Sequence, residues 1–367
     1  MSFRRQFLYL VVHGYTVRRS PWYALHRIDT SRLFCPDGSA DRAANTVVDA
    51  PLPERRMSFN LPGIMQFSLL GRQKDKIVGV DDMGRGVLYD EGSHSVRPLP
   101  SMAPPNCCHT LLSVAVDPQN DVTKDDGAED DGSVYVIEAD PGQPIQALVH
   151  DRNDDWAWRS LPPPPYIHDP SCGTDGCSGA DITCHAVDVH REGDGSLIWV
   201  SIAGRGTYWL DTATHAWTKA GDWALPFRGQ AVPAPELGLW IGFSAMDSGQ
   251  ICASDLAAAV DEDRPPAADH VWDGLAVPEG FSELYSHLVY LGGRQFCVAK
   301  IFELAPHLRH RRCLGCFHLP DEDEGKCFAM FTGVTVLNCG SGRQHRMIKH
   351  RSLRYCIDDS ITGGCVL

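Results

Sequence analysis

Short strand-like runs recur along this chain about every sixty residues, and this repeat is what most restricts the folds open to it. The segment Gly84–Asp90 reads GRGVLYD, and Gly204–Asp211 reads GRGTYWLD. Asp90, Asp151 and Asp211 each end such a run, at intervals of 61 and 60 residues. An Asp in this position can accept hydrogen bonds from the backbone amides of the turn that follows. The spacing therefore predicts one supersecondary unit that is used several times.

The repeated unit is built from strands. Runs of β-branched and aromatic residues are bounded by Gly, Pro, Asp and Asn, and only Ser254–Val260 has a helical pattern. The 34 glycines and 25 prolines together indicate a turn-rich, all-β protein. Four antiparallel strands repeated every ~45–60 residues describe a blade of a kelch-type β-propeller. We expect an all-β fold, a β-propeller of kelch-like four-stranded blades, with six blades favoured over five or seven.

The two ends of the chain predict how such a ring closes. Phe7–His13 and Tyr23–Asp29 are apolar, strand-like runs near the N-terminus, and further runs lie within Ala329–Tyr355. Neither end has enough runs for a four-stranded blade of its own, so closure by N- and C-terminal strands is expected. We expect the first two runs to share a sheet with part of Ala329–Tyr355. The basic residues of Arg343–Arg354 predict an edge strand with a basic solvent face, the alternative being a site for an anionic partner.

The composition does not shift along the chain, and this predicts a single β-propeller domain over residues 1–367. Three irregular segments interrupt the strand pattern, and we expect them to be surface insertions near residues 117–132, 162–181 and 306–326. The first is acidic but lacks the ligand spacing of an EF-hand calcium loop. The second begins with a proline run, which favours a connector between blades over a polyproline ligand.

Charge and cysteine content restrict the partners and the compartment. Lys and Arg number 33 against 47 Asp and Glu, a net charge of −14, which argues against general nucleic-acid or anionic-membrane binding. No apolar run reaches the ~18 residues of a membrane helix. Phe7–Val12 is a six-residue run without a cleavage site after it, so we interpret it as a strand and not as a signal peptide. Fourteen cysteines without a secretory signal predict mostly reduced thiols and a cytoplasmic or nuclear protein.

The densest metal-ligand pattern is a Cys/His group near the C-terminus. Cys313 and Cys316 have the C-x-x-C spacing of two tetrahedral zinc ligands, with His310 and His318 on either side. No second C-x-x-C pair exists, so we favour loop cysteines over a zinc site and predict no cofactor. A looser group consists of Cys172, Cys177, Cys184 and His185.

Candidate nucleophiles and paired carboxylates are weak. Gly242–Met246, GFSAM, begins like the Gly-x-Ser-x-Gly elbow of hydrolases but lacks the final glycine and a following helix. Asp175–Gly179, DGCSG, lies in a loop and matches no hydrolase pattern. Four acidic residues near turn signals could form the carboxylate pair of a glycosidase, although hydrogen bonding to turn amides is the simpler role: Asp81, Asp82, Asp211 and Asp222. We predict no catalytic residue.

Five separated segments carry a family resemblance. They are AGRGTY at 203–208, AGDWALPF at 220–227, PELGLWIGF at 235–243, CASDL at 252–256 and FCVAKIFE at 296–303. In this order they resemble the grass-plant family catalogued as domain of unknown function 1668, from Phe7 to about Tyr355. The resemblance implies a kelch-like or F-box-associated type of β-propeller without an established activity. It supplies no catalytic residue to carry over.

A propeller of this kind presents its loops as a broad platform, which suits partner binding. We therefore expect a non-catalytic protein-interaction or recognition module whose partner is another protein. The first alternative is a hydrolase-type enzyme with its site at the mouth of the central channel. The second is a substrate adaptor that lacks its own F-box and takes it from another chain.

Overall fold

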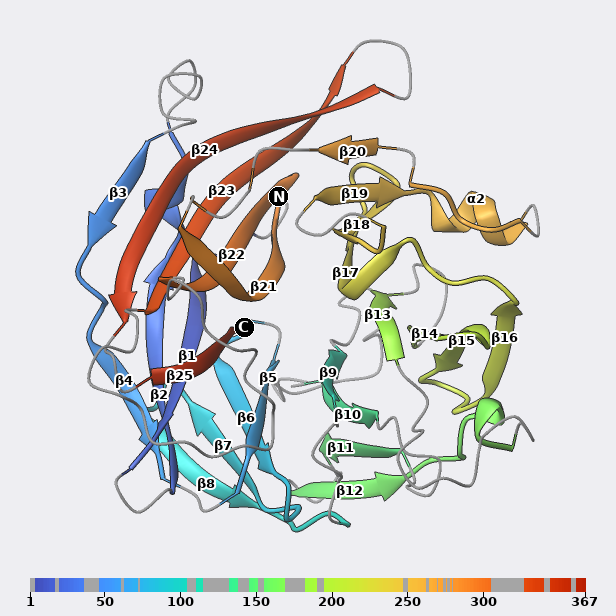
Figure 1. Ribbon diagram of the computed structural model, residues 1–367. Coiled ribbons are helices and arrows are strands. Elements are labelled where there is room, and N and C mark those ends of the chain that lie inside the picture. Colours follow the sequence, from blue (N-terminus) through green and yellow to red (C-terminus); the bar gives the residue numbers. More distant parts are fainter. Residues whose placement is uncertain are drawn as a thin grey trace, which may run out of the picture. The chain divides into compact units, whose positions relative to one another are not determined.

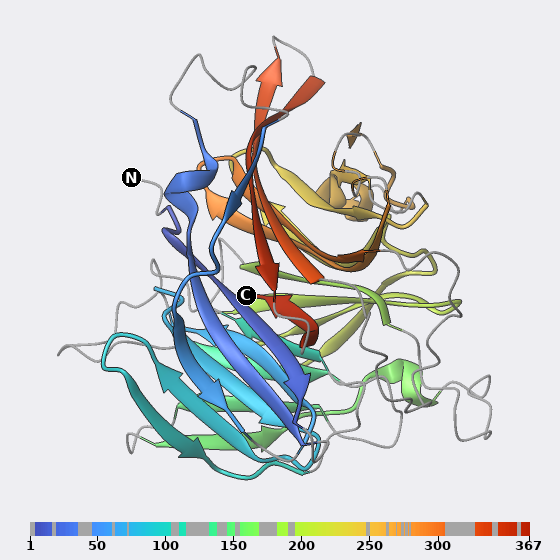
Figure 2. The same cartoon turned by 60° about the vertical axis from the view of Figure 1, so that its left-hand side comes forward.

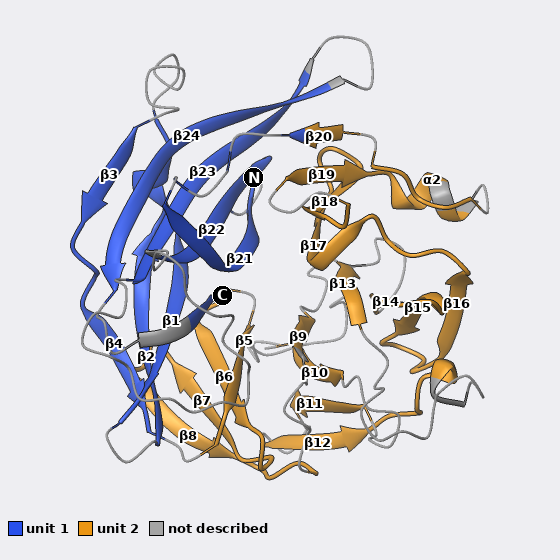
Figure 3. Ribbon diagram, viewed as in Figure 1, with its two compact units in different colours: residues 1–60, 272–367 blue, residues 61–271 orange. Residues whose placement is uncertain are grey.

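The computed structural model consists almost entirely of strands (Figure 1). It divides into two compact units, residues 1–60 with 272–367 (unit 1) and residues 61–271 (unit 2), coloured in Figure 3. The single-domain organisation over residues 1–367 stays a prediction. The structure describes all residues except 1–3, 17–19, 36–45, 61–62, 72, 104–109, 115–131, 138–144, 151–154, 169–181, 190–194, 247–249, 262–263, 269, 273–274, 276–277, 279, 305–326, 340–343 and 358–360.

Unit 2 contains three sheets that follow the chain order. Sheet C is formed by β5 (Met65–Leu70), β6 (Lys76–Asp81), β7 (Gly86–Asp90) and β8 (Ser95–Leu99). Sheet D is formed by β9 (Thr110–Val114), β10 (Ser133–Ile137), β11 (Gln146–His150) and β12 (Trp156–Ser160). Within both sheets each strand pairs antiparallel with the next.

Sheet E joins two further four-stranded sets. The first set is β13 (Ile182–Val189), β14 (Ser196–Ile202), β15 (Gly206–Asp211) and β16 (Trp217–Gly221). The second set is β17 (Phe227–Ala234), β18 (Leu239–Ser244), β19 (Ile251–Ser254) and β20 (His270–Trp272). Their first strands, β13 and β17, pair in parallel over three residues and make one eight-stranded sheet. The short helix α2 (Leu256–Asp261) follows β19, where the sequence predicts a helix, and the 3-10 turn η2 (Pro165–His168) precedes β13.

Unit 1 brings together strands from both ends of the chain. Sheet A has the order β25 (Ile361–Val366), β1 (Phe7–Tyr15), β2 (Pro21–Asp29) and β4 (Arg55–Phe59). Sheet B has the order β21 (Phe281–Gly292), β22 (Gln295–Leu304), β23 (Cys327–Cys339), β24 (Gln344–Ile357) and β3 (Val47–Ala50). A 3-10 turn, η1 (Thr30–Leu33), follows β2. Figure 2 shows the antiparallel β1–β2 pair in dark blue.

Six four-stranded sets are thus present in the part of the chain that the structure describes, one of them with a fifth strand, β3. Four-stranded antiparallel meanders of this kind are the blades of β-propellers. The predicted fold class, all-β and of the β-propeller type, is confirmed. No helix among the described residues has the length and apolar character that crossing a bilayer requires.

The aspartates of the repeat act as the sequence predicts. Asp90 ends β7, and its Oδ1 accepts a hydrogen bond from the amide of Ser93 at 3.1 Å. Asp211 ends β15, and its Oδ1 accepts from the amide of Ala213 at 2.8 Å. The equivalent Asp151 lies outside the described residues. These turns return the chain from the third strand of a set to the fourth.

The sets of unit 2 are also joined by tryptophans on their outer strands. Trp158 of β12 donates from its indole Nε1 to the carbonyl oxygen of Pro100, just beyond β8, at 2.9 Å. Trp217 of β16 donates in the same way to Pro162, just beyond β12, at 3.1 Å. In both cases the acceptor is a proline just beyond the last strand of the preceding set.

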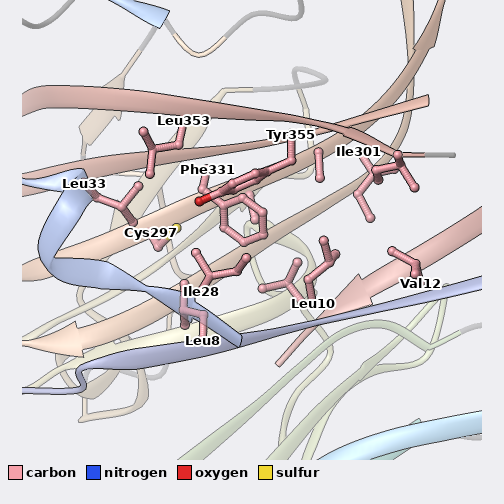
Figure 4. Close-up of a cluster of buried hydrophobic side chains, with 14 of the residues drawn as sticks. Leu8, Leu10, Val12, Ile28, Leu33, Cys297, Ile301, Phe331, Leu353 and Tyr355 are labelled. Atoms are coloured by element: carbon pink, nitrogen blue, oxygen red, sulfur yellow. The ribbon is translucent and has the colours of Figure 1, made fainter. Parts of the chain in front are cut away.

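The core of unit 1 lies between sheets A and B. Leu8, Leu10 and Val12 of β1 point toward Phe331 and Tyr355 of sheet B in Figure 4, and all five side chains are buried. The remaining members of this core include Ile28, Leu33, Cys297, Ile301 and Leu353. The alternating pattern of β1 therefore faces a packed interior, as a strand between neighbouring sheets requires.

Closure by strands from both ends is confirmed, but the predicted C-terminal partner is wrong. β1 pairs antiparallel with β25 at Ile361–Val366, while β23 and β24, the strands within the predicted segment, belong to sheet B. The sequence ITGGCV hides this strand because two glycines interrupt it. Gly364 is nevertheless needed there: a Cβ at this position would lie 2.8 Å from the carbonyl oxygen of Val11.

The prediction of an edge strand at Arg343–Arg354 is also wrong in part. Residues Ser352–Tyr355 of β24 are covered by β3, which pairs with them in parallel. Arg354 forms a two-pronged ion pair with Asp49 of β3, with Nε–Oδ1 at 2.6 Å and Nη2–Oδ2 at 2.9 Å. The segment from β2 to β4 therefore leaves sheet A, adds a strand to sheet B, and returns to sheet A.

Candidate functional site: the turn face of unit 2

Three turns of unit 2 share one construction. Each connects the second strand of a set to the third, and each is hydrogen bonded to the segment that precedes the first strand of the same set. The amide of Asp82 donates to the carbonyl oxygen of Ile64 at 3.0 Å, and that of Ala245 donates to Pro226 at 3.0 Å. The guanidinium of Arg205 donates to the carbonyl oxygen of Tyr166 at 3.0 Å.

Each of these turns lies at the end of its own strand set where the first strand begins. β13 and β17 run parallel, so the β14–β15 and β18–β19 turns lie at the same end of sheet E. β5 contacts β9, and Lys74, which follows β5, donates to Ser113 near the end of β9 at 3.1 Å, so these strands also run the same way. We call this surface the turn face and define it by Ile64, Met83, Arg85, Arg205 and Met246.

Large apolar side chains are exposed on the turn face. Met83 is 60% exposed, Ile64 is 45% exposed and Met246 is 88% exposed. Met and Arg are enriched at protein interfaces, and methionine adapts its shape to different partners. Since the backbone beneath these side chains is hydrogen bonded, the face is a rigid base that carries flexible contact groups.

The positive charge of Arg85 on the turn face is neutralised by Asp81. Asp81 is fully buried, and its carboxylate accepts from the amides of Met83 and Arg85 at 3.0 and 2.8 Å and from Arg85 Nε at 2.7 Å. Arg85 therefore brings no excess positive charge.

The candidate nucleophile and carboxylates lie in turns and strand ends. Ser244 ends β18, and its Oγ accepts from the amide of Met246 at 3.2 Å, which is turn geometry. Asp81 and Asp211 bind turn amides, as expected, and Asp222 pairs with Lys219. The DGCSG segment at 175–179 lies outside the described residues.

Four zinc candidates, His310, Cys313, Cys316 and His318, also lie outside the described residues. Of the looser group only Cys184 and His185 are described, and Cys184 is buried in the apolar core of sheet E. Among the described residues, no three His, Cys, Asp or Glu side chains lie together in a way that could hold a metal ion. Seven of the cysteines that the structure describes are free thiols.

Burial keeps several titratable side chains neutral. It lowers the pKa of His185 on β13 and of His287 on β21 to about 4. It raises the pKa of the Cys252 thiol to about 11 and that of Cys365 to about 12. At neutral pH these imidazoles are uncharged and these thiols are protonated, whereas a nucleophilic cysteine needs a lowered pKa.

These histidines predict how stability depends on pH. In the unfolded chain both should titrate near 6.5, so between pH 6.5 and about 4 the unfolded state binds more protons than the native state. The contribution of these two histidines to the free energy of unfolding should therefore be constant well above pH 6.5 and fall as the pH drops toward 4. Urea denaturation at half-unit pH steps measures this.

A variant separates the histidines from the carboxylates. The pKa values of Asp49 and Asp90 are lowered, chiefly by hydrogen bonding to Arg354 for Asp49 and, for Asp90, by hydrogen bonds that outweigh its desolvation. The stability that these two carboxylates contribute is therefore lost only at a lower pH than the stability contributed by the neutral histidines. The double variant His185→Leu/His287→Leu should have a flatter slope between pH 6.5 and 4.5. An unchanged slope would show that groups other than His185 and His287 take up the protons on unfolding.

Comparison with known proteins gives a family but no activity. Among solved structures, the WD40 domain of SCAP from fission yeast has 11% identity and a TM-score of 0.40, with 96% of this chain and 86% of that chain covered. BamB from Moraxella catarrhalis has 12% identity and a TM-score of 0.34, with 86% and 78% covered. Such low similarity carries no functional argument. The search of curated proteins gave no match.

The sequence itself is more informative, because one family matches nearly its whole length. That family is described as "Protein of unknown function (DUF1668)", and the match covers residues 5–355. The match includes nearly all of the strands of both units and the whole turn face. This chain is a member of the DUF1668 family.

Proposed function

We propose that this protein is an interaction module that binds another protein through the turn face. The observation that carries the proposal is the exposure of Met83 and Met246 on turns whose backbones are fixed by hydrogen bonds to neighbouring segments. Large apolar side chains that remain exposed to solvent mark sites where proteins associate. The free thiols described above support a cytoplasmic or nuclear setting for this interaction.

A pair of matched variants tests the proposal. Met83→Glu/Met246→Glu places two charges on the turn face, while Val96→Glu makes the same change on the outer strand β8, where Val96 is 47% exposed. Each protein serves as bait in quantitative affinity purification from the native tissue. A partner should be recovered by the wild type and by Val96→Glu and lost with the double variant.

Equal melting temperatures of the three baits would confirm that folding is unaffected. Recovery of the same partners by all three baits would contradict the proposal, because the turn face would then contribute nothing to binding. Loss of the partner with the Val96→Glu bait alone would instead place the binding site on the outer strands.

A further inference from the structure

Unit 1 has a cleft of about 350 Å³. It lies at the open end of the β1–β2 hairpin, opposite the turn that joins the two strands. Two short segments line it, Arg4–Phe7 and Asp29–Ser31. The segments are held together by Thr30, whose amide donates to Gln6 and whose Oγ1 lies 2.9 Å from the carbonyl oxygens of both Arg5 and Gln6. The walls are thus fixed by the backbone.

The guanidinium of Arg5 is committed to backbone carbonyls and not to a carboxylate. Its Nε donates to Phe7 and its Nη2 to Leu367, both at 2.8 Å. Burial lowers the pKa of Arg5 to about 10, which reflects a positive charge that its surroundings do not offset. A bound anion would supply the missing charge.

Arg4 lies beside it without an acidic partner. Its guanidinium stacks over the ring of Phe34, 4.9 Å from the centroid, and this contact leaves its N–H groups free to bind a ligand. Among the residues that the structure describes, no carboxylate pairs with Arg4 or Arg5.

The surroundings of the cleft are positive in a chain that is negative as a whole. Arg27 lies over the ring of Phe7 at 4.3 Å, and Arg32 follows in η1. The one carboxylate on the cleft, Asp29, already accepts a hydrogen bond from the amide of Ser31 at 2.8 Å. On the cleft itself, two arginines, Arg4 and Arg5, therefore face one carboxylate that is already hydrogen bonded.

We propose that this cleft binds a phosphate group, held by Arg4 and Arg5 together with the polar groups of Gln6 and Ser31. Guanidinium groups donate paired hydrogen bonds to phosphate oxygens, and hydroxyl and amide groups complete such a site. The phosphate is either free or part of a small phosphomonoester. This site is in unit 1 and does not depend on the proposed function of the turn face.

Two variants with opposite expected effects on phosphate affinity test the proposal. Sodium phosphate and glycerol 3-phosphate are titrated into the protein, with chloride holding the ionic strength constant, and affinity is measured by calorimetry and by the shift in melting temperature. Arg4→Gln should weaken phosphate binding roughly tenfold or more, because it removes charge-assisted hydrogen bonds. Asp29→Asn keeps an acceptor for Ser31 but removes the repelling charge, so it should bind phosphate more tightly.

Arg97→Gln is the matched control, since Arg97 is exposed on β8 of unit 2. It should bind as the wild type does. Tighter binding of glycerol 3-phosphate than of phosphate would identify a phosphomonoester as the ligand, and the reverse would identify free phosphate. Absence of saturable binding to the wild type, or equal binding by Arg4→Gln and Asp29→Asn, would overturn the proposal.

Discussion

Replacing Leu10 by Asp is expected to unfold most of the protein. Leu10 is fully buried, and its strand lies between β2 and β25, where it pairs with His26 and Val366 (Figure 4). A carboxylate there would be buried among the apolar side chains of the unit 1 core. Its neighbour on β2, His26, supplies no balancing charge at neutral pH, because burial lowers the pKa of that imidazole. Burying an unpaired charge costs at least several kcal/mol, against a typical total stability of about 5–15 kcal/mol. The variant should be largely insoluble, and any soluble fraction should lose most of its resistance to urea.

Val47→Asp is the matched control, because it makes a comparable change on β3 at a position that is 43% exposed. It should cost no more than about 0.5 kcal/mol, as surface substitutions usually do. If Leu10→Asp were as stable as Val47→Asp, β1 would not lie in the interior of unit 1.

Deleting residues 1–15 should have an effect of similar size. The deletion removes β1, which separates β2 from β25, so both strands lose their ladder partner on one side. It also removes the paired hydrogen bonds between Tyr9 and Leu367, at 3.1 and 2.9 Å. The exposed strand edges that remain favour aggregation. We expect insoluble protein on expression, and no cooperative melting of refolded material.

The control is a deletion of residues 1–3, which leaves β1 and Arg5 in place. This shorter form should melt at the temperature of the full chain. A soluble 16–367 chain that melted at that same temperature would mean that β2 and β25 complete sheet A without β1.

Local patterns allowed the repeated part of the fold to be predicted. The Asp at the end of a third strand, the Gly-Arg-Gly hairpins and the helix near Ser254–Val260 are each encoded within a few residues, and all are present in the structure. The strands β3 and β25 were not predicted. Their positions depend on partners about 300 residues away, and β25 contains glycines because the backbone of β1 approaches it closely.

The exposed methionines of the turn face could not be predicted from the sequence. In the sequence Met246 belongs only to a Gly-x-Ser pattern and Met83 to no pattern, and a methionine is more often a core residue than an exposed one. Their exposure follows from the turns that hold them, and the amides of Asp82 and Ala245 fix those turns to segments about 20 residues away. The Leu-Pro step at Leu99, Leu161 and Leu225 is a signal that would have aligned the sets of unit 2 more closely.

The crossing of the β2–β4 segment between sheets A and B has a consequence during synthesis on the ribosome. Residues 7–59 are made first, yet β1 and β3 find their partners in β25 and β24, which are made last. At about 5–20 residues per second, the early strands wait roughly 15 to 70 s for the end of the chain. During that interval Leu8, Leu10 and Val12 are exposed in a strand that pairs readily with other chains. Nascent unit 1 should therefore depend on chaperones that bind hydrophobic segments, and slower translation should lower its yield.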